Sequence, residues 1–135
     1  MNKMQGHQIS PETMARYANA YIGLTKARII FVNEDITKDT ASSLSALLLN
    51  YDNSNSELDI DMYINTNGGD SAALANIYDV MQMIKSPIKT ICVGKAYSAG
   101  AVLLAAGTKG KRYIFEHAKV MIHGIQCLFP IAGDT

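Results

Sequence analysis

The sequence predicts an α/β domain in which strands and helices alternate. Three observations support this fold class. The chain has 135 residues, which is the usual size of one domain. Hydrophobic residues make up 48% and charged residues 18%, a composition typical of globular proteins. Short β-branched runs alternate with segments of helical periodicity, which favours strands joined by right-handed helical crossovers.

The first elements are an arm, a helix and a strand. Residues 1–13 are polar and weakly patterned, which indicates a mobile tail. From Pro11 a short helix is predicted, because Met14 and Tyr21 belong to a series of residues at helical spacing. Residues 28–32 are apolar and β-branched and predict a buried strand.

The rest of the chain repeats the strand–helix pattern. Thr37 or Asp39 is suited to cap a helix whose apolar face holds Leu44, Leu47 and Leu48. A helix rich in Ala, Leu and Gly is expected after Ser98, ending at Gly107. The other expected elements are a loop at 50–56, strands at 58–65, 89–93, 113–115 and 119–122, a tight turn at 66–70 and a helix at 71–84.

Composition excludes several classes of protein. Twelve basic residues balance twelve acidic ones, so no surplus of positive charge supports nucleic-acid binding. The apolar runs are far shorter than the ~20 residues that span a bilayer, and the N-terminus lacks the apolar stretch of a secretory signal. Two cysteines, Cys92 and Cys127, provide neither a disulfide framework nor metal-ligand spacing. We expect a cytoplasmic protein without a metal or membrane segment.

Ser98 is the first candidate for chemistry, because it lies between a predicted strand and a predicted helix. At a helix N-terminus, free N–H groups and the helix dipole favour a developing negative charge. The amide of Ala99 is then a candidate oxyanion donor. The alternative is a plain helix N-cap, with Gly100 allowing close packing. The strict nucleophile-elbow pattern has glycine at the position of Ala96.

The glycine pair in the turn 65–69 is the second candidate. Paired glycines after a strand permit positive φ and turn an amide toward a ligand, so Gly69 is suited to supply a second oxyanion donor. The alternative is an ordinary Asn-Gly turn.

His123 is the candidate general base, because it ends an apolar strand and strand ends are rigid platforms for such a group. The alternative is a structural histidine with a satisfied ring. Lys95 precedes Ser98 and is a weaker candidate base, since its offset does not guarantee hydrogen-bond geometry.

Together, the order and spacing of these motifs resemble the proteolytic subunits of the Clp protease, the ClpP family. The resemblance runs from about Arg28 to His123, roughly two-thirds of the chain, and its serine and histidine stretches are the most diagnostic. The matching stretches are 28–31, 63–69, 77–85, 90–101, 103–112 and 120–123.

The resemblance implies a crotonase-like fold of repeated ββα units and a serine endopeptidase. It implies Ser98 as nucleophile, His123 as general base, and an oxyanion hole from the amides of Gly69 and Ala99. Members of the family stack two heptameric rings into a chamber, in which unfolded polypeptides delivered by an ATP-driven AAA+ unfoldase are hydrolysed. No nucleotide loop is found in this sequence, so ATP is expected to belong to the partner.

The sequence departs from the family at several positions. Asn67 stands where the family commonly has proline, which should make the turn less stiff. Docking of the unfoldase is implied through Tyr63 and Met83, although Asp61 and Met83 replace residues that are commonly aromatic.

The end of the chain also departs. The family's triad acid and its long handle helix would follow position 135, so we expect an arm with a short helix at 1–27 and an incomplete head domain at 28–135. Asp134, the only acid after His123, is a candidate third member of the triad. One alternative is therefore a non-catalytic structural or regulatory subunit. Another, an acyl-CoA enzyme of the wider crotonase superfamily, leaves Ser98 and His123 unexplained.

Overall fold

A computed structural model describes residues 9–124 of the chain. Its elements follow one another as α1 (Pro11–Lys26), β1 (Ile29–Val32), α2 (Lys38–Ser54), β2 (Ile60–Thr66), α3 (Ser71–Met83), β3 (Ile88–Tyr97), α4 (Ala99–Ala105), β4 (Arg112–Ile114) and β5 (Lys119–Met121). The strands form one parallel sheet in the order β1-β2-β3-β4, and β5 pairs with the far end of β3. The predicted α/β class and its parallel sheet are confirmed.

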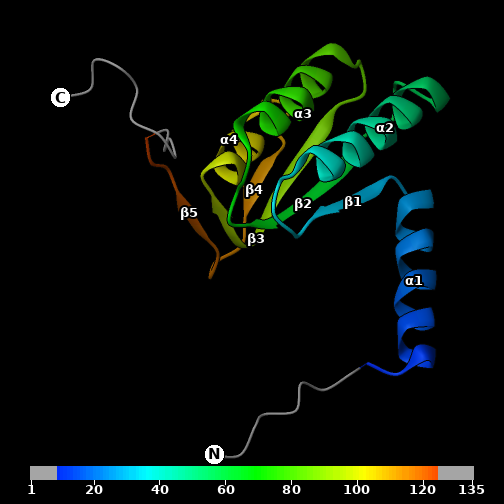
Figure 1. Cartoon of the computed structure of the whole chain (residues 1–135). Helices are drawn as coiled ribbons and strands as arrows, with labels where there is room; N and C mark the ends of the chain where they lie inside the picture. Colours follow the sequence, from blue (N-terminus) through cyan, green and yellow to red (C-terminus); the bar gives the residue numbers. More distant parts are fainter. Residues whose placement is uncertain (1–8, 125–135) are drawn as a thin grey trace, which may run out of the picture.

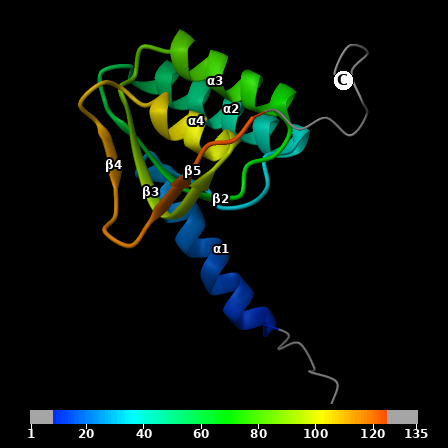
Figure 2. The same cartoon turned by 90° about the vertical axis from the view of Figure 1, so that its left-hand side faces the viewer.

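One face of the sheet carries the core. Helices α2, α3 and α4 lie together on that face, while α1 projects from the body beyond β1 (Figures 1 and 2). Burial alternates along β1 and β2, as expected when every second side chain points toward the helices. Each large side chain that is fully buried contributes about 1.5–3 kcal/mol. The largest of these are Val32, Ile36, Leu48, Ile60, Met62, Ile64, Ile77 and Leu103.

The caps of α2 and α3 fix where these helices begin. The Thr37 hydroxyl accepts a hydrogen bond from the Thr40 amide at 3.2 Å, and the Asp70 carboxylate accepts one from the Ala73 amide at 2.8 Å. Such caps contribute about 1 kcal/mol each. Of the two residues proposed for the start of α2, Thr37 is therefore the cap.

The prediction of a loop at 50–56 is wrong for residues 50–54, because α2 continues to Ser54, and is confirmed only for residues 55 and 56. Tyr51 is buried, and its hydroxyl donates to the Thr25 carbonyl at 2.6 Å. The Arg28 guanidinium donates to the Tyr51 carbonyl at 2.8 Å. These contacts with residues distant in sequence stabilise the last helical turn against the weak helix propensity of its Asn, Asp and Ser residues.

Only one face of the strand that was predicted as buried at 28–32 is in fact buried. Ile30 and Val32 are buried, whereas Ile29 and Phe31 lie half-buried on the other face of the sheet. There the Phe31 ring lies between Tyr63 of β2, at 5.2 Å, and Tyr21 of α1, at 5.8 Å. This aromatic contact joins α1 to the sheet. The helix has no buried residues, and it is longer than the short helix that was expected.

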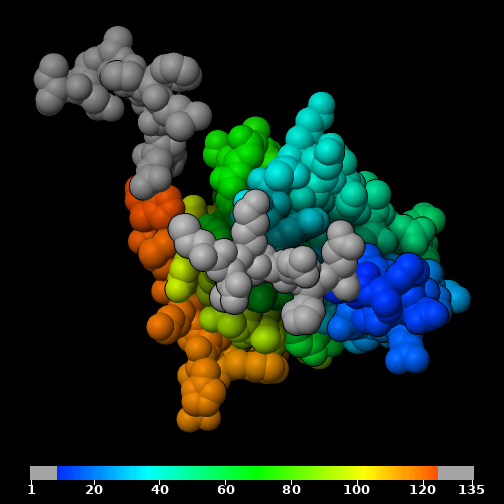
Figure 3. Space-filling view, turned by 60° about the horizontal axis from the view of Figure 1, so that its bottom comes forward, coloured from blue at the N-terminus to red at the C-terminus, as the bar shows by residue number. Residues whose placement is uncertain are grey.

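The strands at the C-terminal end are the most exposed part of the sheet. Every residue of β4 and β5 is exposed, and the segment that holds them projects from the edge of the molecule in orange (Figure 3). β3 extends to Tyr97, four residues beyond the predicted end, and this extension is what pairs with β5. Within residues 9–124, no helix has the length and apolarity needed to cross a membrane.

Candidate active site

The turn between β3 and α4 holds Ser98 in an unusual conformation. Its φ is 55° and its ψ is −118°, and apart from Arg28 it is the only non-glycine residue in the described range with a positive φ. Such a backbone costs about 1–3 kcal/mol and persists only where the surrounding structure enforces it. Ser98 occupies the N-cap position of α4, yet its side chain makes no capping hydrogen bond. The hydroxyl is thus free for another use.

Close contacts on both sides enforce this turn. The Ser98 amide donates to the Met121 carbonyl of β5 at 2.8 Å. A Cβ atom on Gly100 would come within 2.7 Å of the Thr66 methyl group, so only glycine lets α4 lie this near the end of β2. Gly100 therefore allows close packing, as the alternative interpretation proposed. This packing is compatible with a Ser98 hydroxyl that makes no capping hydrogen bond.

The turn after β2 packs directly against the Ser98 turn. Gly68 has a φ of 100°, and a Cβ atom there would lie 2.8 Å from the Tyr97 carbonyl oxygen, 2.9 Å from the Ser98 Cβ and 3.0 Å from the Ala99 nitrogen. Only a residue without a side chain permits that approach. Gly68 therefore has a role that the sequence analysis missed: it brings the glycine pair against the serine.

Gly69 is placed by a short parallel bridge to Ile36. The Ile36 amide donates to the Gly68 carbonyl at 2.9 Å, and the Asp70 amide donates to the Ile36 carbonyl at 2.8 Å. Because N–H and C=O groups alternate in direction along an extended chain, the Gly69 amide faces away from Ile36. Among residues 9–124, neither the Gly69 amide nor the Ala99 amide has a hydrogen-bond partner.

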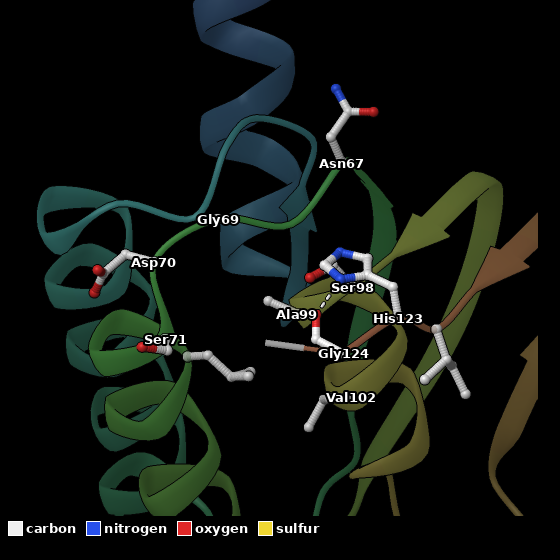
Figure 4. A pocket seen from close by; sticks show the side chains of 11 residues that line it. Asn67, Gly69, Asp70, Ser71, Ser98, Ala99, Val102, His123 and Gly124 are labelled. Atoms are coloured by element: carbon white, nitrogen blue, oxygen red, sulfur yellow. Dashed lines mark hydrogen bonds between the residues drawn. The ribbon is translucent and has the colours of Figure 1, made fainter. Parts of the chain in front are cut away.

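These groups line one pocket of about 470 Å³. Figure 4 shows Ser98, Ala99 and the His123 ring in it, with Asp70 and Ser71 on the α3 side. Within residues 9–124, the pocket thus combines a hydroxyl that caps no helix, two amides without a hydrogen-bond partner and an imidazole. Its full lining is Asn67, Gly69, Asp70, Ser71, Leu74, Ser98, Ala99, Val102, Ile122, His123 and Gly124.

His123 enters the pocket from β5. The strand pairs with residues 95–97 of β3, and the histidine follows its last residue by two positions. The ring is exposed, and its Nδ1 lies 2.5 Å from the Gly124 carbonyl oxygen. A carbonyl oxygen only accepts hydrogen bonds, so Nδ1 carries the proton and Nε2 is left as the basic nitrogen. In the described part of the chain, no hydrogen bond joins the ring to Ser98, a geometry that is common before substrate binds.

The other predicted residues lie outside this pocket. Tyr63 stacks on Phe31, and Met83, at the end of α3, is 65% exposed. The Lys95 ammonium lies 5.7 Å above the Tyr97 ring and does not line the pocket. Asp134 lies outside the described residues.

In the part of the chain that the structure describes, the titratable groups give no sign of a metal site or of a second nucleophile. Over residues 9–124, no group of three His, Cys, Asp or Glu side chains could hold a metal ion. Cys92 is fully buried, and burial raises the pKa of its thiol, which makes it a poor nucleophile. Cys127 lies outside the described residues.

Comparison with known proteins gives a consistent result. The Clp protease family model matches residues 12–130. The ATP-dependent Clp protease proteolytic subunit 1 of Prochlorococcus marinus and the ATP-dependent Clp protease proteolytic subunit of Deinococcus radiodurans are each 48% identical over 108 residues. That is 80% of this chain, and 55% and 53% of theirs. The ATP-dependent Clp protease proteolytic subunit 3 of a Synechococcus strain is 43% identical over 129 residues, 96% of this chain and 62% of its own. The chain thus spans little more than half the length of these curated relatives.

Proposed function

This chain belongs to the Clp protease family, and from that premise we propose that it is a serine endopeptidase subunit of a Clp-type, ATP-dependent protease. Its substrates would be unfolded polypeptides. The observation that carries the proposal is the strained backbone of Ser98, whose side chain makes no capping hydrogen bond. It lies in one pocket with an imidazole and with two amides that have no hydrogen-bond partner among the described residues. Strain of this kind is retained where function requires it.

The hydroxyl, the imidazole and the two amides each have a part in peptide hydrolysis. The Ser98 hydroxyl oxygen attacks the scissile carbonyl carbon while Nε2 of His123 takes its proton. The carbonyl oxygen becomes an oxyanion, which the Gly69 and Ala99 amides stabilise. The imidazolium then returns the proton to the leaving amine as the carbon–nitrogen bond breaks. A water molecule, deprotonated by His123, hydrolyses the acyl-serine and regenerates the hydroxyl.

The tautomer of His123 suits this role. In serine proteases a carboxylate normally holds the proton on the ring nitrogen that faces away from the serine. Here the Gly124 carbonyl accepts from Nδ1 and selects the same tautomer. A carbonyl stabilises the imidazolium less than a carboxylate does, so we expect slower turnover than with a full triad.

A non-catalytic subunit is the second candidate, and one observation favours it. Within the described residues, the His123 ring is hydrogen-bonded to its own neighbour and not to Ser98. If Nε2 of the ring still makes no hydrogen bond to the Ser98 hydroxyl with substrate bound, the pocket serves structure or regulation only. The acyl-CoA alternative has no comparable support, since the family match is to Clp proteases.

Assembly and partners extend the proposal. We place the chain in heptameric rings, which the family stacks in pairs, fed by an AAA+ unfoldase that docks at Tyr63 and Met83 and that hydrolyses the ATP. The exposed Met83 side chain and the stacked Tyr63 ring are consistent with docking. The cytoplasmic location stays a prediction.

Labelling with a fluorophosphonate tests the proposal, because the reagent forms a covalent bond with an activated serine. The chain is expected to react once, at Ser98, as read by peptide mass spectrometry. Ser98→Ala should abolish labelling. Ser71→Ala is the matched control, since it removes another hydroxyl from the same pocket and should leave labelling unchanged. A folded chain that never reacts at Ser98 would favour the non-catalytic subunit.

A further inference from the structure

Thr66, the last residue of β2, connects the two turns that form the pocket. It is 2% exposed. Pairing between β2 and β3 shifts register after Ile64 and resumes at Thr66, which is opposite Ala96. Thr66 and Ala96 are thus the last paired residues of β2 and β3. After them, β2 leads into the glycine turn and β3 leads into the Ser98 turn.

Its hydroxyl makes two hydrogen bonds that converge on the glycine turn. It donates to the Glu34 carbonyl at 2.7 Å and accepts from the Gly68 amide at 3.1 Å. Glu34 precedes the segment that carries Ile36, whose backbone brackets Gly69. One hydroxyl therefore fixes both the turn and the segment to which the turn is bridged.

The methyl group of the same side chain faces α4. A Cβ atom on Gly100 would lie only 2.7 Å from this methyl group, so the methyl group fills the space that such an atom would need. Gly68, held by the hydroxyl, lies in turn against the Ser98 Cβ and the Ala99 nitrogen. The Thr66 side chain thus contacts the glycine turn through its hydroxyl and α4 through its methyl group.

We infer that Thr66 is a positioning residue, whose buried hydroxyl holds the Gly68 amide and the Glu34 carbonyl so that the Gly69 and Ala99 amides meet at one oxyanion. This inference rests on the proposed function. Thr66 would touch no substrate and would act through the backbone. Because misplacement of a reacting group by about 1 Å can cost 10²-fold in rate, loss of the hydroxyl should act on the chemical step.

The test uses the whole chain and the kinetics of fluorophosphonate labelling. Thr66→Val keeps the shape and removes the hydroxyl, and we expect it to lower the limiting inactivation rate about 10–100-fold. The reagent concentration at half-maximal rate and the final labelled fraction should not change. Partial unfolding would instead lower the labelled fraction. Thr66→Ser keeps both hydrogen bonds and should react within about 3-fold of wild type.

Thr90→Val is the matched control. Thr90 is equally buried, lies on the neighbouring strand β3 and donates its hydroxyl to the Leu104 carbonyl at 2.8 Å, away from the glycine turn. It should change stability as Thr66→Val does, without slowing the labelling. The inference is overturned if Thr66→Val reacts like wild type, if Thr66→Ser slows as much as Thr66→Val, or if Thr90→Val slows equally.

A second measurement, made on the wild-type chain, tests the inference if the Thr66→Val chain does not fold. In wild type, hydrogen exchange should be slower at the Gly68 amide, which Thr66 holds, than at the Gly69 amide. Equal exchange at the two amides would overturn the inference. A wild-type chain that is never labelled at Ser98 would instead overturn the proposed function itself.

Discussion

The two walls of the pocket are built in different ways. The wall that holds Ser98 and the two amides rests on the core, where Thr66 and Ala99 are buried and a Cβ atom on Gly68 would lie only 2.8–3.0 Å from the serine turn. The wall that holds His123 rests on β5, whose residues are all exposed, and the neighbouring Ile122 is 83% exposed.

This difference separates stability from reactivity. Core packing fixes the proposed nucleophile and oxyanion donors before substrate arrives, so changes there should affect both folding and chemistry. The proposed base is located by a few parallel hydrogen bonds to β3 and by the contact with Gly124. Changes on that side should affect chemistry and leave the free energy of unfolding nearly constant.

The largest effect on labelling is expected for His123→Ala. Removing the proposed general base should slow fluorophosphonate labelling of Ser98 by on the order of 10²–10⁴-fold. The free energy of unfolding, measured in urea, should stay within about 0.5 kcal/mol of wild type because the ring is exposed.

His117→Ala is the control for the base. His117 is also exposed and lies in the turn between β4 and β5, outside the pocket. It should change neither quantity. A His123→Ala chain that is labelled as fast as wild type would remove the base from the proposed reaction.

Gly68→Ala tests the other wall. A Cβ atom there meets backbone atoms at 2.8–3.0 Å with a φ of 100°. Overpacking and backbone strain should lower the free energy of unfolding by roughly 2–4 kcal/mol. The displaced turn should slow labelling about 10²-fold.

Gly110→Ala isolates the strain, because its φ is 84° and a Cβ atom would meet nothing within 4 Å. The substitution should lower the free energy of unfolding by about 1 kcal/mol and leave the labelling rate unchanged. If Gly68→Ala and Gly110→Ala lower the free energy of unfolding equally, the close approach of Gly68 to the Ser98 turn contributes nothing to stability.

The smallest effect on the pocket is expected for Asp52→Asn, which touches neither wall. The Ser86 amide, at 2.8 Å, and the Lys85 amide, at 3.0 Å, donate to the Asp52 carboxylate. Hydrogen bonding, chiefly from the Ser86 backbone, lowers the pKa of Asp52 in the folded chain. The carboxylate therefore stabilises the fold above its unfolded pKa of about 3.9, and this contribution is lost as pH falls through the folded value.

In a urea series from neutral to acidic pH, Asp52→Asn should lose stability less steeply than wild type below about pH 4. Its labelling rate at neutral pH should match wild type. Parallel pH curves for the two chains would show that the carboxylate makes no pH-dependent contribution.

Sequence predicted the parts of the site that depend on local order. Ser98 between a strand and a helix, the glycine pair after β2 and the histidine after β5 follow from neighbouring residues. The helix cap at Thr37 is likewise encoded within a few positions. Local patterns were sufficient for the α/β class and for the order of its elements.

Features that depend on distant contacts were not predictable in the same way. Composition around Tyr51 indicates a loop, yet Thr25 and Arg28 hold it in a helix. Thr66 lies in the predicted turn at 66–70, where no neighbouring residue indicates what its hydroxyl would contact. Its importance comes from Glu34 on one side and Gly100 on the other, which only the folded chain brings together.

The most direct measurement is a crystal structure of the Ser98 fluorophosphonate adduct. The phosphonyl oxygen should lie about 2.7–3.1 Å from the backbone nitrogens of both Gly69 and Ala99. An adduct whose phosphonyl oxygen faces solvent, with either nitrogen beyond hydrogen-bond distance, would contradict the convergence of these two amides on one oxyanion.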